Sequence, residues 1–176
     1  MSKFFKALSV TLLLLILIVI IIGLFLPPNY TVNRSIIIDA KPAAIHEYVG
    51  DLKKWREWEP WSEQDPTIIT NYGDKTSGIG ASQSWIGKDG DGQLILTSSS
   101  PAKGIEYDVL FDSGKYECKS AMVYEPMEDG QTKVTWSMQG YMDKPIIGGY
   151  IALIMESITG PMFERGLDNL KKQVEE

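Results

Sequence analysis

The pattern of hydrophobic and polar positions divides this chain into two unlike segments, which meet near residue 26. Residues 7–26 contain no charged side chain, and a helix of that length rises about 30 Å, enough to cross a bilayer core. The run predicts an N-terminal transmembrane anchor over residues 1–26, followed by a short linker over residues 27–33 that begins with two prolines. A cleaved secretory signal is the competing interpretation, although its apolar region is usually only about 7–15 residues long and precedes a small-residue cleavage site.

The few charges around the apolar run predict its orientation. Lys3 and Lys6 precede it, whereas the basic residues that soon follow it are offset by Asp39. Cytoplasmic flanks of membrane helices carry an excess of lysine and arginine, so the N-terminus is predicted to be cytoplasmic. The sequence thus predicts a single-pass protein of the cell membrane that contacts the lipid bilayer through residues 7–26 and holds its domain outside the cytoplasm, in the periplasm.

Beyond the linker, the spacing of apolar residues predicts both strands and helices. The β-branched run at residues 30–38 predicts a strand, and Pro42 and Asp51 precede two short helical patterns. Alternation of apolar and polar residues then predicts a meander of six strands over residues 68–72, 81–86, 93–100, 104–111, 115–124 and 133–140.

A long amphipathic helix is predicted at the C-terminus. Its buried face follows from apolar residues at intervals of four, three and four, namely Phe163, Leu167, Leu170 and Val174. Gly160-Pro161 precedes this pattern, and because proline removes a helical hydrogen bond, residues 147–158 are predicted to form a separate segment kinked against the long helix. An antiparallel sheet that curls around one helix leaves space between the two, where few side chains reach across.

Several motifs, taken in order, resemble one known superfamily. They are the tryptophan-rich segment 51–61 (DLKKWREWEPW) with Asp65-Pro66, Trp85-Ile86-Gly87, Gln131–Trp136 with Gly140, and Gly166–Lys171. Over about residues 30–175 the chain resembles the SRPBCC (START-like, helix-grip) superfamily, and within it the polyketide cyclase/dehydrase-type branch. The resemblance implies an α+β helix-grip domain over residues 30–176, preceded here by one transmembrane helix. Its order is strand, two short helices, five or six more strands and a helix, with a curved antiparallel sheet of about six or seven strands around that long C-terminal helix.

The resemblance also implies a function. Members of the superfamily hold lipids, hydrophobic hormones or polyketides in an apolar cavity, and some add catalysis without a catalytic motif common to all. We therefore expect a membrane-anchored domain that binds a small, lipid-like hydrophobic ligand without a cofactor. One alternative is an enzyme of the polyketide cyclase/dehydratase type that uses the same cavity with unknown catalytic residues, and another is a non-catalytic envelope interaction module with unknown protein partners. The expected cavity residues are Trp58, Trp61, Trp85, Leu94, Leu96, Tyr107, Val109, Trp136, Met138, Ile154, Phe163 and Leu167.

Composition narrows the chemistry further. Residues 27–176 carry all 23 acidic side chains and every one of the 17 basic ones except Lys3 and Lys6, a net charge of −8 that opposes nucleic-acid binding. The single cysteine, Cys118, and the single histidine, His46, exclude an internal disulfide and any metal site built from several thiolates or imidazoles, so no metal is expected. His46 could act as a general base, but its position on a short helix favours a solvent-exposed ring.

Four further segments each have more than one interpretation. The three tryptophans of residues 55–61 could rim a cavity or fill the gap between the short helices and the sheet. The four carboxylates of residues 57–65 could perform acid/base chemistry or form a solvated rim. Residues 89–92 (DGDG) resemble part of a calcium loop but favour a tight hairpin turn. Residues 145–158, apolar nearly all round, could gate the cavity, contact bilayer lipid or simply pack.

Overall fold

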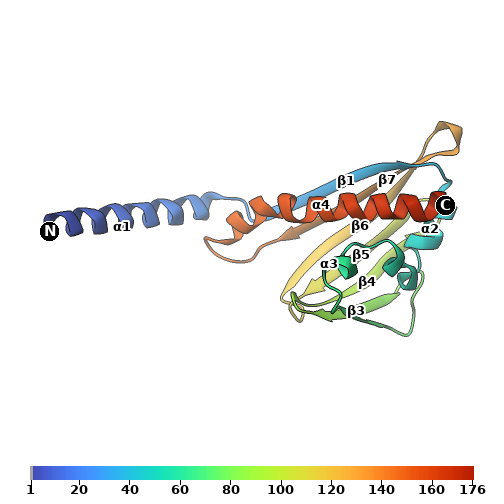
Figure 1. Cartoon of the computed structure of the whole chain (residues 1–176), viewed down its shortest axis with the longest axis horizontal. Helices are drawn as coiled ribbons and strands as arrows, with labels where there is room; N and C mark the ends of the chain where they lie inside the picture. The colour runs from blue at the N-terminus through green and yellow to red at the C-terminus, as the bar shows by residue number, and fades with distance from the viewer. Residues whose placement is uncertain (1) are drawn as a thin grey trace.

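The computed structural model describes residues 2–176 as a long N-terminal helix joined to one α+β domain (Figure 1). The elements in chain order are α1 (Ser2–Phe25), β1 (Asn29–Ile38), α2 (Pro42–Val49), the 3₁₀ helix η1 (Leu52–Glu57), α3 (Trp61–Gln64), β2 (Ile69–Tyr72), β3 (Ser82–Gly87), β4 (Gly90–Ser100), β5 (Gly104–Phe111), β6 (Tyr116–Pro126), the 3₁₀ turn η2 (Glu128–Gly130), β7 (Thr132–Tyr141) and α4 (Gly148–Glu175).

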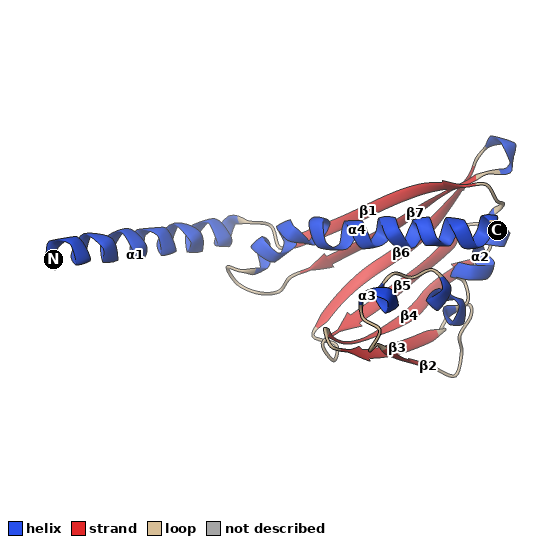
Figure 2. Ribbon diagram, in the orientation of Figure 1, coloured by secondary structure: helices blue, strands red, loops and turns tan. Residues whose placement is uncertain are grey.

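The seven strands form one antiparallel sheet in the order β1-β7-β6-β5-β4-β3-β2. The first strand pairs with the last, with Val32 opposite Met138, and the other strands follow as a simple meander. The sheet curves around α4 (Figures 1 and 2). The predicted fold class is therefore confirmed, and the predicted strand ends lie within three residues of the observed ones.

Alternation along the strands builds the core, as the sequence predicts. In β7, Val134, Trp136 and Met138 are buried, and the residues between them face the more open side of the sheet. The opposing face of α4 buries its predicted apolar stripe, including Phe163, whose ring stacks on Trp136 with the centroids 4.2 Å apart. Packing of this kind stabilises the C-terminal half of α4 against the sheet.

One predicted boundary is wrong, because α4 is a single helix that runs through Pro161. The side chain of Arg34 crosses the helix at this point and explains the continuity. Its guanidinium lies where a Cβ at residue 160 would stand, so only glycine leaves room for it. Arg34 pairs with Glu156 at 2.6 Å and with Glu164 at 2.5 Å, one on each side of the proline. Pro161 itself faces solvent, where water can satisfy the carbonyl group that its missing N–H leaves free.

The N-terminal helix α1 projects from the domain (Figure 1). Its segment Lys3–Phe25 is long and apolar enough to cross a membrane, and almost none of it is buried against the rest of the chain. Its large aliphatic side chains from Leu8 to Leu24 are about half exposed or more, with the exception of Ile20.

Candidate functional site

A cavity of about 570 Å³ lies between the concave face of the sheet and the N-terminal half of α4. It exists because α4 packs mainly against β1, at one edge of the sheet, so the helix covers the more distant strands only loosely. The floor is a row of cross-strand neighbours, in which Leu94 lies opposite Val109 and Val109 opposite Cys118. Ile151 and Met155 of α4 close the other side, so the walls are largely apolar.

The structure brings together six of the twelve residues expected around the cavity. These six are Trp61, Trp85, Leu94, Tyr107, Val109 and Met138. Five others lie in the solid core beyond the cavity lining, namely Trp58, Leu96, Trp136, Phe163 and Leu167. Ile154 instead points outward and is 51% exposed. The periodicity identifies the inward positions, but it does not tell where along α4 the helix leaves the sheet.

Several lining residues were missed by sequence reasoning. Tyr30, Trp55 and Cys118 occupy inward positions of β1, η1 and β6. Ile151 and Met155 lie four residues apart on α4, within the segment 145–158 for which a gate of the cavity was one interpretation. The alternation of apolar and polar residues in β6 is enough to predict that Cys118 points inward. The contribution of α4 to the cavity wall could not be predicted, because Gly160-Pro161 indicated a break in a helix that is in fact continuous. The three tryptophans divide between the two interpretations. Trp58 is a buried filler between η1 and the sheet, whereas Trp55 and Trp61 line the cavity, Trp55 as a buried residue.

The ionisable groups deepest in the cavity are neutral at physiological pH. Burial raises the pKa of the Tyr30 and Tyr107 hydroxyls above the ordinary value and raises the pKa of the Cys118 thiol to about 11. The Tyr107 hydroxyl also accepts a hydrogen bond of 2.8 Å from Trp136 Nε1. Neutral hydroxyl and thiol groups can orient a ligand by hydrogen bonding, but they do not supply a base at pH 7.

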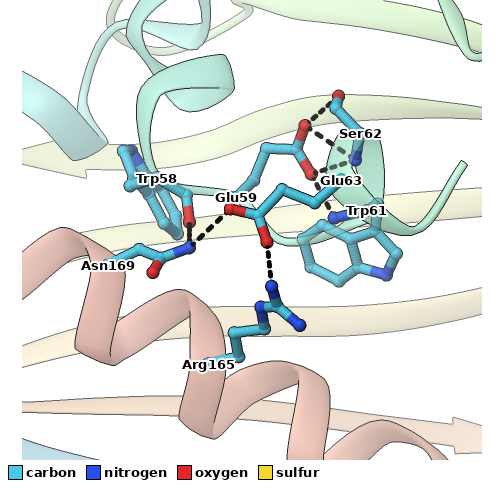
Figure 3. Close-up of polar contacts among 7 residues, drawn as sticks. All are labelled: Trp58, Glu59, Trp61, Ser62, Glu63, Arg165 and Asn169. Carbon is cyan, nitrogen blue, oxygen red and sulfur yellow. Dashed lines mark hydrogen bonds and ion pairs between the residues drawn. The ribbon is translucent and has the colours of Figure 1, made fainter. Parts of the chain in front are cut away.

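The carboxylates near the cavity mostly hold the backbone in place. Glu59 accepts the Trp61 N–H at 2.6 Å, while Glu63 pairs with Arg165 at 2.5 Å and lies within reach of the Asn169 amide on α4 (Figure 3). Because Asn169 also donates to the Trp58 carbonyl oxygen at 3.2 Å, these contacts tie α3 to α4 and fix the position of Trp61.

For Asp65 the predicted solvated rim is wrong, since this carboxylate is buried. It accepts the Thr67 hydroxyl at 2.5 Å and the backbone N–H groups of Thr67 and Lys88 at 3.0 Å. These hydrogen bonds, first that of the Thr67 hydroxyl, lower the pKa of Asp65, so it stays ionised and bound to the backbone. Residues 89–92 form part of a tight hairpin, as the favoured interpretation predicts, in which Gly87 pairs with Gly90 across the turn of Lys88 and Asp89.

The ring of His46 is half-buried, so the predicted solvent exposure is wrong, and it lies outside the cavity lining. Its Nε2 is 3.1 Å from the Ser99 hydroxyl, and the Tyr124 ring lies edge-on beside it. The strands β4 and β6, rather than α2 alone, bury the ring, and the pattern of one short helix carries no signal of that contact. Burial lowers the pKa of His46 below the ordinary value of 6.5.

Acidification is expected to destabilise the fold through His46. Because the folded-state pKa is depressed, the unfolded chain binds a proton more readily, so the contribution of this ring is fully present above pH 6.5 and is lost as the pH falls through the folded pKa. Thermal unfolding of the full chain in detergent, measured from pH 7.5 to 5, should show this decline, and His46→Gln should flatten it. Parallel curves for the two proteins would contradict the prediction.

A curved antiparallel sheet that grips a C-terminal helix over an apolar cavity defines a helix-grip domain of the SRPBCC type. The chain belongs to the family described as polyketide cyclase / dehydrase and lipid transport, whose model matches residues 30–175. No curated protein sequence gives a significant match.

Solved structures share the fold at low sequence identity. A protein from Thermobifida fusca is 20% identical, with a TM-score of 0.62 over 82% of this chain and 92% of that chain. Protein CV1439 from Chromobacterium violaceum is 14% identical, with a TM-score of 0.61 over 83% and 97% of the two chains. Norcoclaurine synthase from Thalictrum flavum is 12% identical, with a TM-score of 0.61 over 83% and 94%. At such identities the likeness shows the fold alone.

Proposed function

We propose that this protein is a membrane-anchored binding protein for a small, lipid-like hydrophobic molecule. The observation that carries the proposal is the apolar cavity of about 570 Å³ between sheet and helix. Ligand sites have volumes of about 300–1,000 Å³ and combine apolar walls with a few polar groups that set orientation. Burial of apolar surface, at about 25 cal/mol per Å², is the driving force, and the Tyr30 and Tyr107 hydroxyls are the orienting groups.

Binding is favoured over catalysis by the chemistry of the cavity. The buried tyrosine and cysteine groups are protonated at neutral pH. Among the lining carboxylates, Glu59, Asp65 and Asp91 accept backbone N–H groups, and Asp89 and Glu117 are exposed to water. A cyclase or dehydratase needs a group that accepts a proton from the substrate. The family name includes lipid transport beside the two activities, and the cavity fits that part of it best.

The anchor in this proposal is α1. A bilayer would bury its exposed aliphatic side chains, and its length matches a bilayer core of about 30 Å. Residues 1–26 are then the anchor and 30–176 the ligand-binding domain, and the predicted linker 27–33 shortens to the two prolines Pro27 and Pro28, because β1 begins at Asn29. Lys3 and Lys6 favour a cytoplasmic N-terminus and a periplasmic domain.

Native mass spectrometry of the full chain, purified in detergent from its own membrane, tests the proposal. We expect a co-purifying lipid-like mass that is released on unfolding. Cys118, the single cysteine, lines the cavity, so its alkylation by a small maleimide at pH 9 reports whether the cavity is filled. A protein without bound mass, whose alkylation rate is unchanged by an extract of membrane lipids, would refute the proposed function.

A further inference from the structure

The end of α1 packs directly on the start of α4. The Tyr150 hydroxyl donates a hydrogen bond of 2.7 Å to the Val19 carbonyl oxygen, which lies about 9 Å before the end of α1 along its axis. Gly23 faces the Ile146 carbonyl oxygen, and a Cβ at residue 23 would overlap it. Ile146 itself has a φ of 68°, a left-handed conformation that a β-branched residue adopts only where its surroundings fix it. The first turn of α4 therefore lies at the level of the last turns of α1.

An exposed apolar stripe continues from this contact along α4. Ile147, Ile154 and Ile158 are spaced by seven and four residues, so they share one face of the helix, and Ile154 and Ile158 are 51% and 57% exposed. The same face becomes polar beyond Pro161, with Arg165 and Lys172 at the corresponding positions. The apolar stretch thus ends part-way along α4, as expected for a helix that leaves a bilayer interface.

The cavity opens at this same end of the domain. Its lining includes the ends of the strands on the side where β1 begins, among them Trp85, Phe111 and Tyr141, all partly exposed. On that side only a short connection with two prolines separates the end of α1 from the start of β1. On α4, the cavity-facing Ile151 and Met155 lie on the stripe adjacent to Ile154 and Ile158. One border of the opening is therefore the exposed apolar stripe.

From this geometry we propose that the N-terminal half of α4 contacts the same bilayer that holds α1, so that the cavity exchanges its ligand with that bilayer without passage through water. The exchange route rests on the ligand binding of the proposed function, whereas the membrane contact rests only on its anchor, α1. Bilayer lipid is the occupant that continuity with α1 specifies, since any surface at the level of Gly23 and Val19 borders the membrane in which that helix lies. The tether holds the stripe beside the bilayer, so a weak intrinsic affinity suffices.

Depth-dependent quenching tests the membrane contact. In a Cys118→Ala background, single probes of nitrobenzoxadiazole are placed at Ile154→Cys and Ile158→Cys in the full chain, reconstituted in phosphatidylethanolamine/phosphatidylglycerol nanodiscs with a nitroxide-labelled phospholipid. Lys172→Cys is the matched control, because it is exposed and lies five turns further, about 27 Å, on the same face as Ile154. We expect several-fold stronger quenching at the two isoleucine positions than at residue 172.

Ligand exchange is tested in the unlabelled chain with Cys118 intact. The double variant Ile154→Ser/Ile158→Ser should load more slowly from phosphatidylethanolamine/phosphatidylglycerol vesicles, as read by protection of Cys118 from alkylation, while its melting temperature stays unchanged. The control is Ile69→Ser/Ile86→Ser, which alters two exposed isoleucines paired across β2 and β3, away from the stripe.

The outcomes separate the inference from the proposed function. Equal quenching at residues 154, 158 and 172 would overturn the membrane contact, even if the cavity binds lipid. Blue-shifted probes at residues 154 and 158 that the nitroxide lipid does not quench would indicate a protein partner and would overturn it as well. Strong quenching there, with Cys118 never protected by lipid, would support the contact and refute the proposed ligand. Equal loading rates for both double variants would overturn the exchange route.

Discussion

Replacing Trp136 by alanine is expected to lower the free energy of unfolding by about 3–5 kcal/mol. The side chain is fully buried and stacks on Phe163 of α4, with its ring edge-on to Trp58 and Trp61 at 5.5 Å. Its Nε1 also donates to the Tyr107 hydroxyl, which would lose that partner inside the core. One substitution therefore removes the contact between the sheet, the tryptophan-rich segment and the C-terminal helix.

Denaturant unfolding of the full chain in detergent, followed by far-ultraviolet circular dichroism, measures this effect. Trp85→Ala is the matched control, because Trp85 is partly exposed, lines the cavity and has Phe111 as its aromatic neighbour at 5.8 Å. We expect the control to cost much less, since it enlarges an existing space instead of opening one in packed core. Equal losses for the two variants would contradict the role of Trp136 as the centre of the core.

The architecture of the domain could be predicted because its signals are local. A period of two along each strand decides which residues face inward, and a period near 3.6 decides the buried face of α4. Tyr107, Val109 and Met138 were found in this way, since each occupies an inward position on a strand that crosses the cavity floor. Turn residues such as those between β3 and β4 then divide the meander correctly.

The extent of the cavity could not be predicted, because it depends on how far α4 stands from the sheet at each turn. Phe163 and Leu167 touch the sheet and lie in solid core, whereas Ile151 and Met155, on the same helix, face open space. The continuity of α4 through Pro161 depends on Arg34, a residue more than 120 positions earlier in the chain. His46 likewise gains its neighbours from strands that its own helix does not specify.

Val109→Trp is expected to abolish ligand binding while leaving the fold intact. Val109 occupies the middle of the cavity floor, between Leu94 and Cys118 on the neighbouring strands, so an indole at this position extends into open space. Ordinary overpacking of a core costs stability because no such space exists. The added ring displaces apolar contacts worth more than about 1.4 kcal/mol, so affinity should fall by more than about tenfold.

The matched control is Val123→Trp, which introduces the same ring on the exposed face of β6. Both variants, purified as full chains, should show similar melting temperatures, and only Val109→Trp should lose the co-purifying mass in native mass spectrometry. An unfolded Val109→Trp would leave no binding to compare, so Val109→Phe provides a smaller filling of the same space, with a partial loss expected. A ligand retained in full by a folded Val109→Trp protein would lie outside this cavity, and the proposed function would then be wrong in its central assignment.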